Sequence, residues 1–148
     1  MSGEPALFEL RDAMPFAALL GIELLTAGPG RVRGRGRLAW APERCTAGGI
    51  LHGGAIMALA DTCGGACSFL NLPAQARATS TIASTTNFLR AVRAGAVIAT
   101  SEPLHIGRTL IVIQTEVSHE DESAVAHVIQ TQGFYYPRPR ASAEPDRG

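Results

Sequence analysis

The chain has 148 residues, enough for one domain, because two halves would each be too short to bury a convincing core. Apolar residues make up 46% of the chain, charged residues make up 18%, and 13 basic side chains balance 13 acidic ones. This balance argues against a disordered acidic protein and against a strongly basic nucleic-acid-binding protein. We therefore expect a single globular domain over residues 1–136 that binds no nucleic acid.

The first twenty residues predict a short amphipathic helix. Leu7, Leu10 and Met14 share one stripe, Pro15 interrupts the helix, and the pattern resumes over residues 16–20. The segment carries acidic residues and lacks a basic start followed by an apolar run, so it does not resemble a secretory signal. We expect a cytoplasmic protein.

Residues 21–40 alternate with period two around a turn at residues 28–30, which predicts a β-hairpin. One face of the hairpin carries Gly34 and Gly36, which are poor strand formers unless another element must approach the sheet closely. The other face is charged, and we expect it to be solvated rather than a nucleic-acid track. It is formed by Arg31, Arg33, Arg35 and Arg37.

Residues 51–72 form a long apolar segment whose length alone would suffice to span a membrane. Asp61 lies at its middle, accompanied by four glycines and by His52. A carboxylate at this position favours a helix surrounded by protein over a membrane span. We predict a long central helix over about residues 53–71 and no membrane contact.

The chain has three cysteines, which is too few, and an odd number, for a disulfide-stapled secreted domain. They are Cys45, Cys63 and Cys67. No further ligand at metal-site spacing accompanies Cys63 and Cys67. We predict buried free thiols and no metal site.

Four strand-like runs follow the helix, joined by short connections that predict an antiparallel meander. Their bounds are Thr79 to Leu89, Ala96 to Leu104, Thr109 to Ser118 and Ala124 to Tyr136. Residues 137–148 have nothing to bury, and we expect a disordered C-terminal tail. The order of two strands, one apolar helix and four strands is best satisfied by an antiparallel sheet of about six strands wrapped around the helix. This α+β arrangement is the hotdog fold.

Asp61 is the first candidate catalytic residue. Its helical neighbours Leu59 and Cys63 are apolar, so its carboxylate would lose hydration, and no basic residue of the helix pairs with it. One interpretation is a general base or nucleophile, because a desolvated carboxylate is a stronger base. The other is structural: Asp61 accepts hydrogen bonds from backbone or threonine groups and fixes the register.

The segment His52-Gly53-Gly54 lies where the helix begins. The first N–H groups of a helix lack internal acceptors, and glycine lets a substrate approach, so the Gly53 N–H is a candidate oxyanion donor. The alternative is that the two glycines only form the turn into the helix. His52 either orients the substrate carbonyl or caps the turn.

Gly53 and Asp61 lie eight residues apart on one predicted helix, which separates them by about 12 Å. They cannot act on one carbonyl group, since attack requires atoms about 3 Å apart. The acid must therefore come from a second copy of the chain, with the two long helices antiparallel across a two-fold axis. We predict an obligate homodimer, with a homotetramer of two dimers as a further option.

Three motifs occur in order along the chain: LHGGAIMALAD, NFLRAVRAG and a later Gly-Arg turn. In them, over roughly residues 16–136, the chain resembles the PaaI-type acyl-CoA thioesterases, which are named for phenylacetate degradation and are related to 4-hydroxybenzoyl-CoA thioesterases. The resemblance implies a hotdog fold, hydrolysis of acyl-CoA and two shared sites in each dimer. It implies no cofactor, since coenzyme A is part of the substrate.

The resemblance also implies supporting residues around Asp61. Relatives often carry an asparagine six residues before the histidine, where this chain has Thr46, whose hydroxyl cannot replace an amide in full. Relatives place a serine or threonine near the acid. Thr81 is the nearest candidate for that position, with Thr79 and Ser80 as rivals.

For coenzyme A, the resemblance implies contacts from Asn87, Arg90 and Arg93 and from Arg108 in the Gly-Arg turn, and we place Gly54 with the substrate-binding residues. Arginine suits phosphate because its planar fork donates paired hydrogen bonds. The alternative for each arginine is an ordinary solvated side chain.

We predict an acyl-CoA thioesterase that hydrolyses an aryl- or medium-chain acyl-CoA to the free acid and coenzyme A. A non-catalytic acyl-CoA sensor and a dehydratase or hydratase of acyl thioesters remain as alternatives, and water attack and carboxylate attack both stay open. The acyl group is expected to lie along the central helix. The helix residues small enough to leave room for it are Ala55, Met57, Ala58, Gly64 and Gly65.

Overall fold

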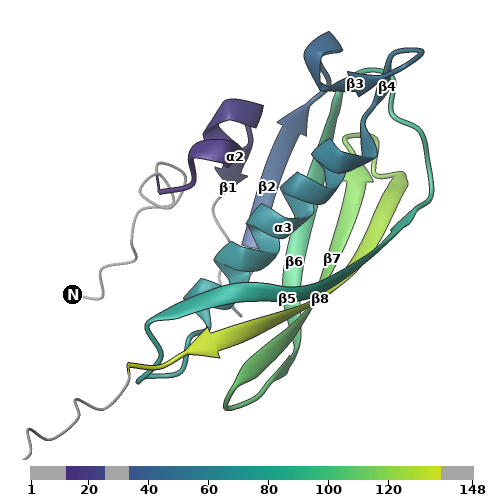
Figure 1. Cartoon of the computed structure of the whole chain (residues 1–148). Coiled ribbons are helices and arrows are strands. Elements are labelled where there is room, and N and C mark those ends of the chain that lie inside the picture. Colours follow the sequence, from purple (N-terminus) through teal and green to yellow (C-terminus); the bar gives the residue numbers. More distant parts are fainter. Residues whose placement is uncertain (1–12, 26–33, 138–148) are drawn as a thin grey trace, which may run out of the picture.

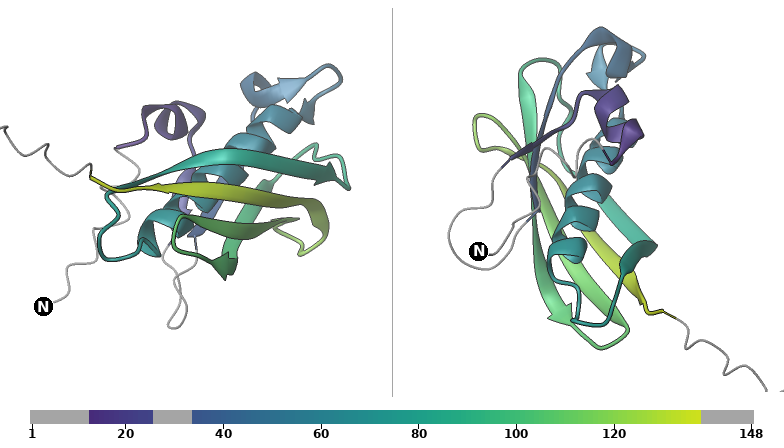
Figure 2. Two further views of the ribbon diagram at one scale, coloured as in Figure 1. Left: turned by 60° about the horizontal axis from the view of Figure 1, so that its bottom comes forward. Right: turned by 90° about the vertical axis from the view of Figure 1, so that its left-hand side faces the viewer.

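A long helix, α3 (Gly53–Leu70), lies against a six-stranded antiparallel sheet that curves around it (Figures 1 and 2). The computed structural model describes residues 13–25 and 34–137. This arrangement confirms the predicted hotdog fold, and α3 has nearly the predicted bounds. Of the predicted tail from residue 137, all but the first residue lies outside the described part.

The remaining elements have the following bounds. Before α3 come α2 (Pro15–Leu20), β1 (Glu23–Leu25), β2 (Gly34–Ala39), the 3-10 helix η1 (Pro42–Arg44), β3 (Cys45–Thr46) and β4 (Ile50–Leu51). After α3 come β5 (Ala78–Phe88), β6 (Ala96–Ile106), β7 (Leu110–His119) and β8 (Ala124–Tyr135).

Pro15 begins helix α2, which contains the residues 16–20 over which the predicted pattern resumes. Its fixed φ and missing N–H suit the first position of a helix. Gly21 ends α2 with a left-handed conformation (φ 70°). Leu7 and Leu10 of the predicted stripe lie outside the described residues.

The predicted hairpin is present as β1 paired with β2, and its glycine face receives α3. A Cβ atom on Gly34 would overlap the Cys63 carbonyl oxygen, and one on Gly36 would lie 2.7 Å from Cys63 Sγ. Both glycines are buried, so their absent side chains are what allows the helix to pack this closely. The turn at 28–30 and two of the four arginines lie outside the described residues.

The predicted meander is wrong for β5. The sheet order is β1-β2-β6-β7-β8-β5, so β6, β7 and β8 are consecutive neighbours, but β5 pairs with β8 at the far edge. The reason is the path of residues 89–95, which form no hairpin turn. Within this segment the carbonyl oxygen of Val92 accepts from the Leu51 N–H at 2.8 Å, and that of Gly95 accepts from the Trp40 N–H at 2.8 Å. Residues 89–95 therefore cross beside the start of α3 and bring the chain next to the end of β2.

Helix α3 is long and apolar enough to cross a membrane by length and composition alone, and half of it is buried within the fold. Leu59, Ala60 and Cys63 on its sheet-facing side are fully buried, whereas Met57 and Asp61 are exposed. The sheet therefore covers one side of α3 and leaves the side that carries the acid open.

Candidate active site

His52 caps helix α3. It is extended (φ −63°, ψ 134°), and its Nδ1 accepts a hydrogen bond from the Gly54 N–H at 2.8 Å. This satisfies one of the N–H groups that a helix start leaves unpaired. Of the two roles considered for His52, the structure shows the capping role. The Gly54 N–H is therefore already paired with His52 Nδ1.

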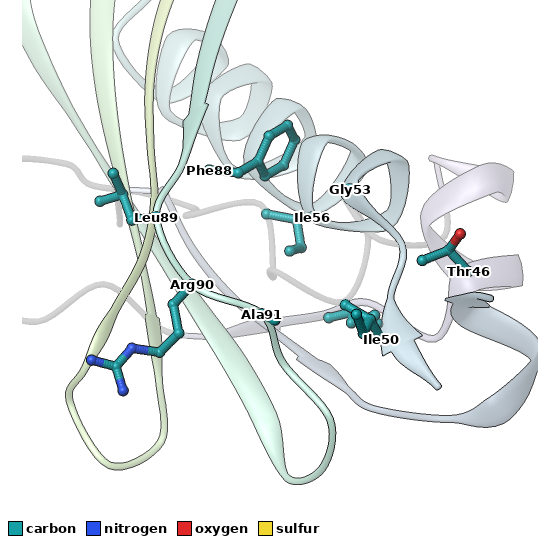
Figure 3. A pocket seen from close by; sticks show the side chains of 9 residues that line it. Thr46, Ile50, Gly53, Ile56, Phe88, Leu89, Arg90 and Ala91 are labelled. Carbon is teal, nitrogen blue, oxygen red and sulfur yellow. The ribbon is translucent and has the colours of Figure 1, made fainter. Parts of the chain in front are cut away.

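The Gly53 N–H has no acceptor among the residues that the structure describes. Gly53 lines a surface pocket of about 470 Å³ that is mostly apolar (Figure 3). Phe88 reaches toward the first turn of α3, and a Cβ atom on Gly53 would lie 3.0 Å from the edge of its ring. The other residues around the pocket are Thr46, Ile50, Leu51, Ile56, Leu89, Arg90 and Ala91.

Several predicted site residues meet at or near this pocket. Thr46 and Arg90 line it together with Gly53, although the Arg90 side chain extends away from Gly53 (Figure 3). Arg93 lies nearby, where its Nη1 donates to the Gly48 carbonyl oxygen at 2.9 Å and ties down the turn between β3 and β4. Asn87 is on β5 but faces the side of the sheet opposite to its neighbour Phe88, because side chains alternate along a strand.

Asp61 is exposed, so the prediction that the helix would bury it is wrong for the single chain. The reason is geometric: its apolar neighbours face the sheet, while Asp61 projects from the open side of α3. Its Oδ1 accepts hydrogen bonds from Thr81 Oγ1 and from Gln130 Nε2, both at 2.7 Å. Of the three hydroxyl candidates, Thr81 is the one that contacts the acid.

A chain of hydrogen-bonded polar side chains extends from this contact into the interior, where Gln132 and Ser68 are buried. Gln132 Nε2 donates to Thr81 Oγ1 at 2.8 Å, and Gln132 Oε1 accepts from Thr79 Oγ1 at 3.4 Å. Thr79 Oγ1 in turn lies 2.6 Å from Ser68 Oγ on α3, within hydrogen-bond distance. Every member is thereby hydrogen-bonded, which is what a buried polar group needs.

Sequence reasoning missed Gln130 and Gln132, although both are almost fully buried. A signal was present, because they occupy inward positions of β8 in register with buried Val128 and Phe134. Two glutamines in the middle of an apolar, period-two series mark a polar site on the dry face of a sheet.

Helix residues predicted to line an acyl pocket divide between two sides. Ala55 and Gly64 are buried toward the sheet, and the space above Gly64 is filled by Gln130 Oε1. These two positions therefore leave no room for an acyl group. Met57, Ala58 and Gly65 lie on the open side or at its margin.

Arg108 lies at the other end of the molecule from Gly53. It lines a second pocket of about 600 Å³ with Pro73 and Gln75, which follow the C-terminal end of α3, and its carbonyl oxygen accepts from the Tyr136 hydroxyl. The residues predicted to bind coenzyme A are thus divided, in one protomer, between the two ends of a helix about 26 Å long.

The three thiols are free, as predicted. Burial raises the pKa of Cys63 to about 12 and that of Cys67 to about 11, so both stay protonated at neutral pH. Cys45 is half-buried instead of buried, and its Sγ donates to the Ala41 carbonyl oxygen at 3.2 Å. Cys63 and Cys67 therefore act as packing groups beneath β2.

Comparison with known proteins supplies the family. A model of the thioesterase superfamily matches residues 48–126, more than half of the chain. The chain belongs to the thioesterase superfamily. The part of this thioesterase that the family model matches includes Gly53, Asp61, Thr81 and Phe88. A candidate esterase of Deinococcus radiodurans is 36% identical to it over 126 residues, covering 84% of this chain and 82% of that protein.

Solved structures share the fold of this thioesterase. A Haemophilus influenzae thioesterase aligns with a TM-score of 0.83 and 24% identity over 95% of both chains. The Escherichia coli PaaI protein, from the phenylacetic acid degradation operon, aligns with a TM-score of 0.75 and 23% identity over 87% of this chain and 90% of that one. At these identities the likeness establishes the hotdog fold.

Proposed function

We propose that this thioesterase is of the PaaI type and hydrolyses acyl-CoA to the free acid and coenzyme A at a site shared between two protomers. The observation that supports this most is the separation of the two reactive groups. The Gly53 N–H opens on a pocket that Asp61 does not line, and the Asp61 carboxylate lies about 12 Å further along the helix. Each protomer then contributes half of each site.

A homodimer would also cover the apolar surface around these groups. Strand β5 ends the sheet, and several large apolar side chains on it and near it are exposed. Ile82 is 65% exposed, Phe88 51%, Leu89 60% and Met57 on α3 43%. Since large contiguous apolar patches on a monomer mark interaction sites, a second copy packed on β5 and the open side of α3 would bury them.

In the proposed reaction, the thioester carbonyl oxygen lies against the Gly53 N–H of one protomer and the carbonyl carbon faces Asp61 of the other. Asp61 takes a proton from a water molecule while the water oxygen forms a bond to the carbonyl carbon. The negative charge that develops on the carbonyl oxygen is stabilised by the Gly53 N–H and by the positive end of α3. The carbon–sulfur bond then breaks, and the thiolate of coenzyme A leaves and is protonated.

Direct attack by Asp61 is the other route. A carboxylate oxygen of Asp61 would form a mixed anhydride with the acyl group as the thiolate leaves, and water would then hydrolyse that anhydride. A single turnover in heavy-oxygen water distinguishes the two routes. Label that appears first in Asp61 excludes direct water attack, because only hydrolysis of the anhydride at the Asp61 carboxyl carbon places the label there.

The remaining predicted residues take supporting roles in this proposal. Thr81 orients the Asp61 carboxylate, His52 holds the first turn of α3 in the shape that exposes the Gly53 N–H, and Thr46 lies beside the attacking water. Arg90 and Arg93 contact the phosphates of coenzyme A at the mouth of the pocket.

Asn87 and Arg108 reach coenzyme A only if the assembly brings them to the pocket, and the antiparallel dimer does so for Arg108. When Asp61 of one chain lies opposite Gly53 of the other, the two-fold axis passes near Met57. The C-terminal end of one α3, with its Arg108, then lies beside β3 and β4 of the other chain. This brings the two groups of predicted arginines together.

The acyl group in this proposal is an aryl or medium-length aliphatic chain. Ile50, Ile56 and Phe88 give the pocket beside Gly53 an apolar lining, and a volume of about 470 Å³ is of the size that small-molecule sites have. The open side of α3 provides further apolar contacts through Met57.

Thiol release from a panel of CoA esters, including benzoyl-CoA and hexanoyl-CoA, tests the proposal. The wild-type protein is expected to release free thiol, and Asp61→Asn is expected to lower kcat by about a hundredfold or more with the fold intact. A protein that binds these esters and releases no thiol would be an acyl-CoA sensor instead. Loss or gain of water on an enoyl-CoA would identify a dehydratase or hydratase.

A further inference from the structure

Gln130 is a fully buried amide whose two ends have different surroundings. Its Nε2 donates to Asp61 Oδ1 at 2.7 Å, while its Oε1 is buried and has no hydrogen-bond partner among the residues that the structure describes. The amide orientation follows from chemistry, because a carboxylate only accepts, so the N–H group must face Asp61. A buried acceptor without a partner costs stability, which an apolar side chain of the same size would avoid.

Helix α3 leaves a specific space for this amide. A Cβ atom at position 64 would overlap Gln130 Oε1, so only glycine at that position allows the side chain to lie against the helix and reach Asp61. The contact joins residues 69 apart in the sequence, from the centre of β8 to the middle of α3. Gly64 and Gln130 together thus present one N–H group to the acid.

Both hydrogen bonds to Asp61 reach the same oxygen. Thr81 Oγ1 and Gln130 Nε2 each donate to Oδ1, and within the described residues Oδ2 has no partner. Gln132 Nε2 donates to Thr81 Oγ1, so the single hydroxyl proton of Thr81 is directed to the carboxylate. The Thr81 hydroxyl and the Gln130 amide therefore both direct a donor to Oδ1.

We propose that Gln130 is a positioning residue that, with Thr81, fixes Oδ1 of Asp61 and leaves Oδ2 as the oxygen that reacts. The proposal rests on the proposed thioester hydrolysis at Asp61. A carboxylate held at one oxygen by two donors cannot rotate freely, so Oδ2 keeps one direction relative to the substrate carbonyl. The unpaired Oε1 lowers the stability of the fold, and in this proposal the Gln130 amide is retained because it places the reacting oxygen of Asp61 precisely.

Gln130→Met is the variant that tests this role, because methionine keeps the length of the side chain and removes only its polar end. With benzoyl-CoA or hexanoyl-CoA, we expect kcat to fall about tenfold or more while KM changes less than about twofold. We also expect Tm to be equal or higher, because the unpaired Oε1 is removed as well. A purely structural role would instead lower Tm and leave kcat of the folded protein unchanged.

Gln114→Met is the matched control. Gln114 lies on the other face of the sheet, where its Nε2 donates to Glu102 Oε1 at 2.7 Å, so it repeats the amide–carboxylate pair away from the site. It is expected to leave kcat and KM unchanged. A Gln130→Met protein with wild-type kcat, or one that fails to fold, would overturn the positioning role.

Asp61→Asn in the same assay separates this proposal from the proposed function. If Asp61→Asn retains full kcat, the hydrolytic role of Asp61 fails, and the positioning role fails with it. If Asp61→Asn is inactive while Gln130→Met is fully active, only the positioning role fails. In the Asp61→Asn background, Gln130→Met is expected to cause no further loss, because the group it positions is already gone.

Discussion

Gly53 and Asp61 lie on one helix but face different parts of the molecular surface. Gly53 begins α3 and opens on a pocket beneath Phe88, whereas Asp61 projects eight residues later from the open side of the helix and contacts Thr81. About 12 Å of helix separates them, and no side-chain motion can close that distance. In the proposed dimer, a second copy of the chain placed antiparallel across this side would close the distance without any change in the fold.

Gly53→Pro tests the oxyanion donor by removing its N–H and little else. Proline is well tolerated at the first position of a helix, and His52 already has the extended conformation that a residue before proline requires. We expect kcat for CoA-ester hydrolysis to fall by about 10² to 10³. Gly53→Ala retains the N–H and is the control: its Cβ atom displaces the exposed Phe88 ring, and a loss below about tenfold is expected. Equal activity in the two variants would remove Gly53 from the mechanism.

The packing of α3 on β2 predicts different outcomes for two glycines. Gly34→Ala is expected to destabilise the protein by about 3 kcal/mol or more, because the added methyl group meets the Cys63 backbone carbonyl, which cannot move aside. Gly36→Ala meets the Cys63 sulfur atom instead. Adding Cys63→Ala should therefore recover part of the stability of Gly36→Ala and none of that of Gly34→Ala. Urea unfolding of the two glycine variants, the two double variants, Cys63→Ala alone and the wild type measures this coupling, and equal rescue of both glycine variants would contradict it.

His119 predicts a pH effect at the turn between β7 and β8. The Ala94 carbonyl oxygen, 3.0 Å from its Nε2, and then the Asp121 carboxylate raise the pKa of His119 above 6.5, while hydrogen bonds from Ser123 lower the pKa of Asp121 to about 2. Because the folded pKa of His119 is the higher one, its contribution to stability is complete below about pH 6.5 and is lost as the pH rises through the folded value.

Titration of the histidine ring protons by NMR measures this pKa. In Asp121→Asn the pKa of His119 is expected to fall but to remain above its ordinary value, since the Ala94 contact contributes most. The effect on Tm is expected to be small, because the His119 ring is partly accessible to solvent and the Asp121 side chain is exposed. A wild-type His119 that titrates at or below the ordinary value would contradict the assigned contacts.

Local patterns in the sequence were sufficient for much of the fold. The apolar run with Asn71 and Pro73 at its end places α3 within one residue of its observed end, and the glycines of β2 indicate that a bulky element covers them. These features depend on neighbours in the chain and on side-chain size, which a sequence displays directly. The start of α3 directly after His52 is likewise predicted from local residues.

Pairing of β5 with β8 could not be read from the same patterns. Short spacing between strand-like runs suggests consecutive pairing, yet residues 89–95 pair with Leu51 and Trp40 instead of forming a turn. The partner of a strand depends on where the preceding chain has gone, which is a property of the whole fold.

The surroundings of Asp61 combine predictable and unpredictable parts. Its position in an apolar helix was evident, but its exposure depends on which side of α3 the sheet covers. Thr81 could be narrowed to three neighbouring residues, and period-two alternation turns Ser80 away from the face of Thr79 and Thr81. Gln130 lies 69 residues from Asp61, and only the polar break in the apolar face of β8 indicates it.

The shared site itself is tested most directly by mixing two inactive proteins. Asp61→Asn retains an intact Gly53, and Gly53→Pro retains an intact Asp61, so a mixed dimer of the two has one complete site and one site with both groups lost. Unfolding equal amounts together and refolding them gives about half mixed dimers, and the expected rate is about one quarter of wild type. Each variant refolded alone should stay inactive. Recovery of that rate is the result this account predicts, and a mixture as inactive as its two components would contradict it.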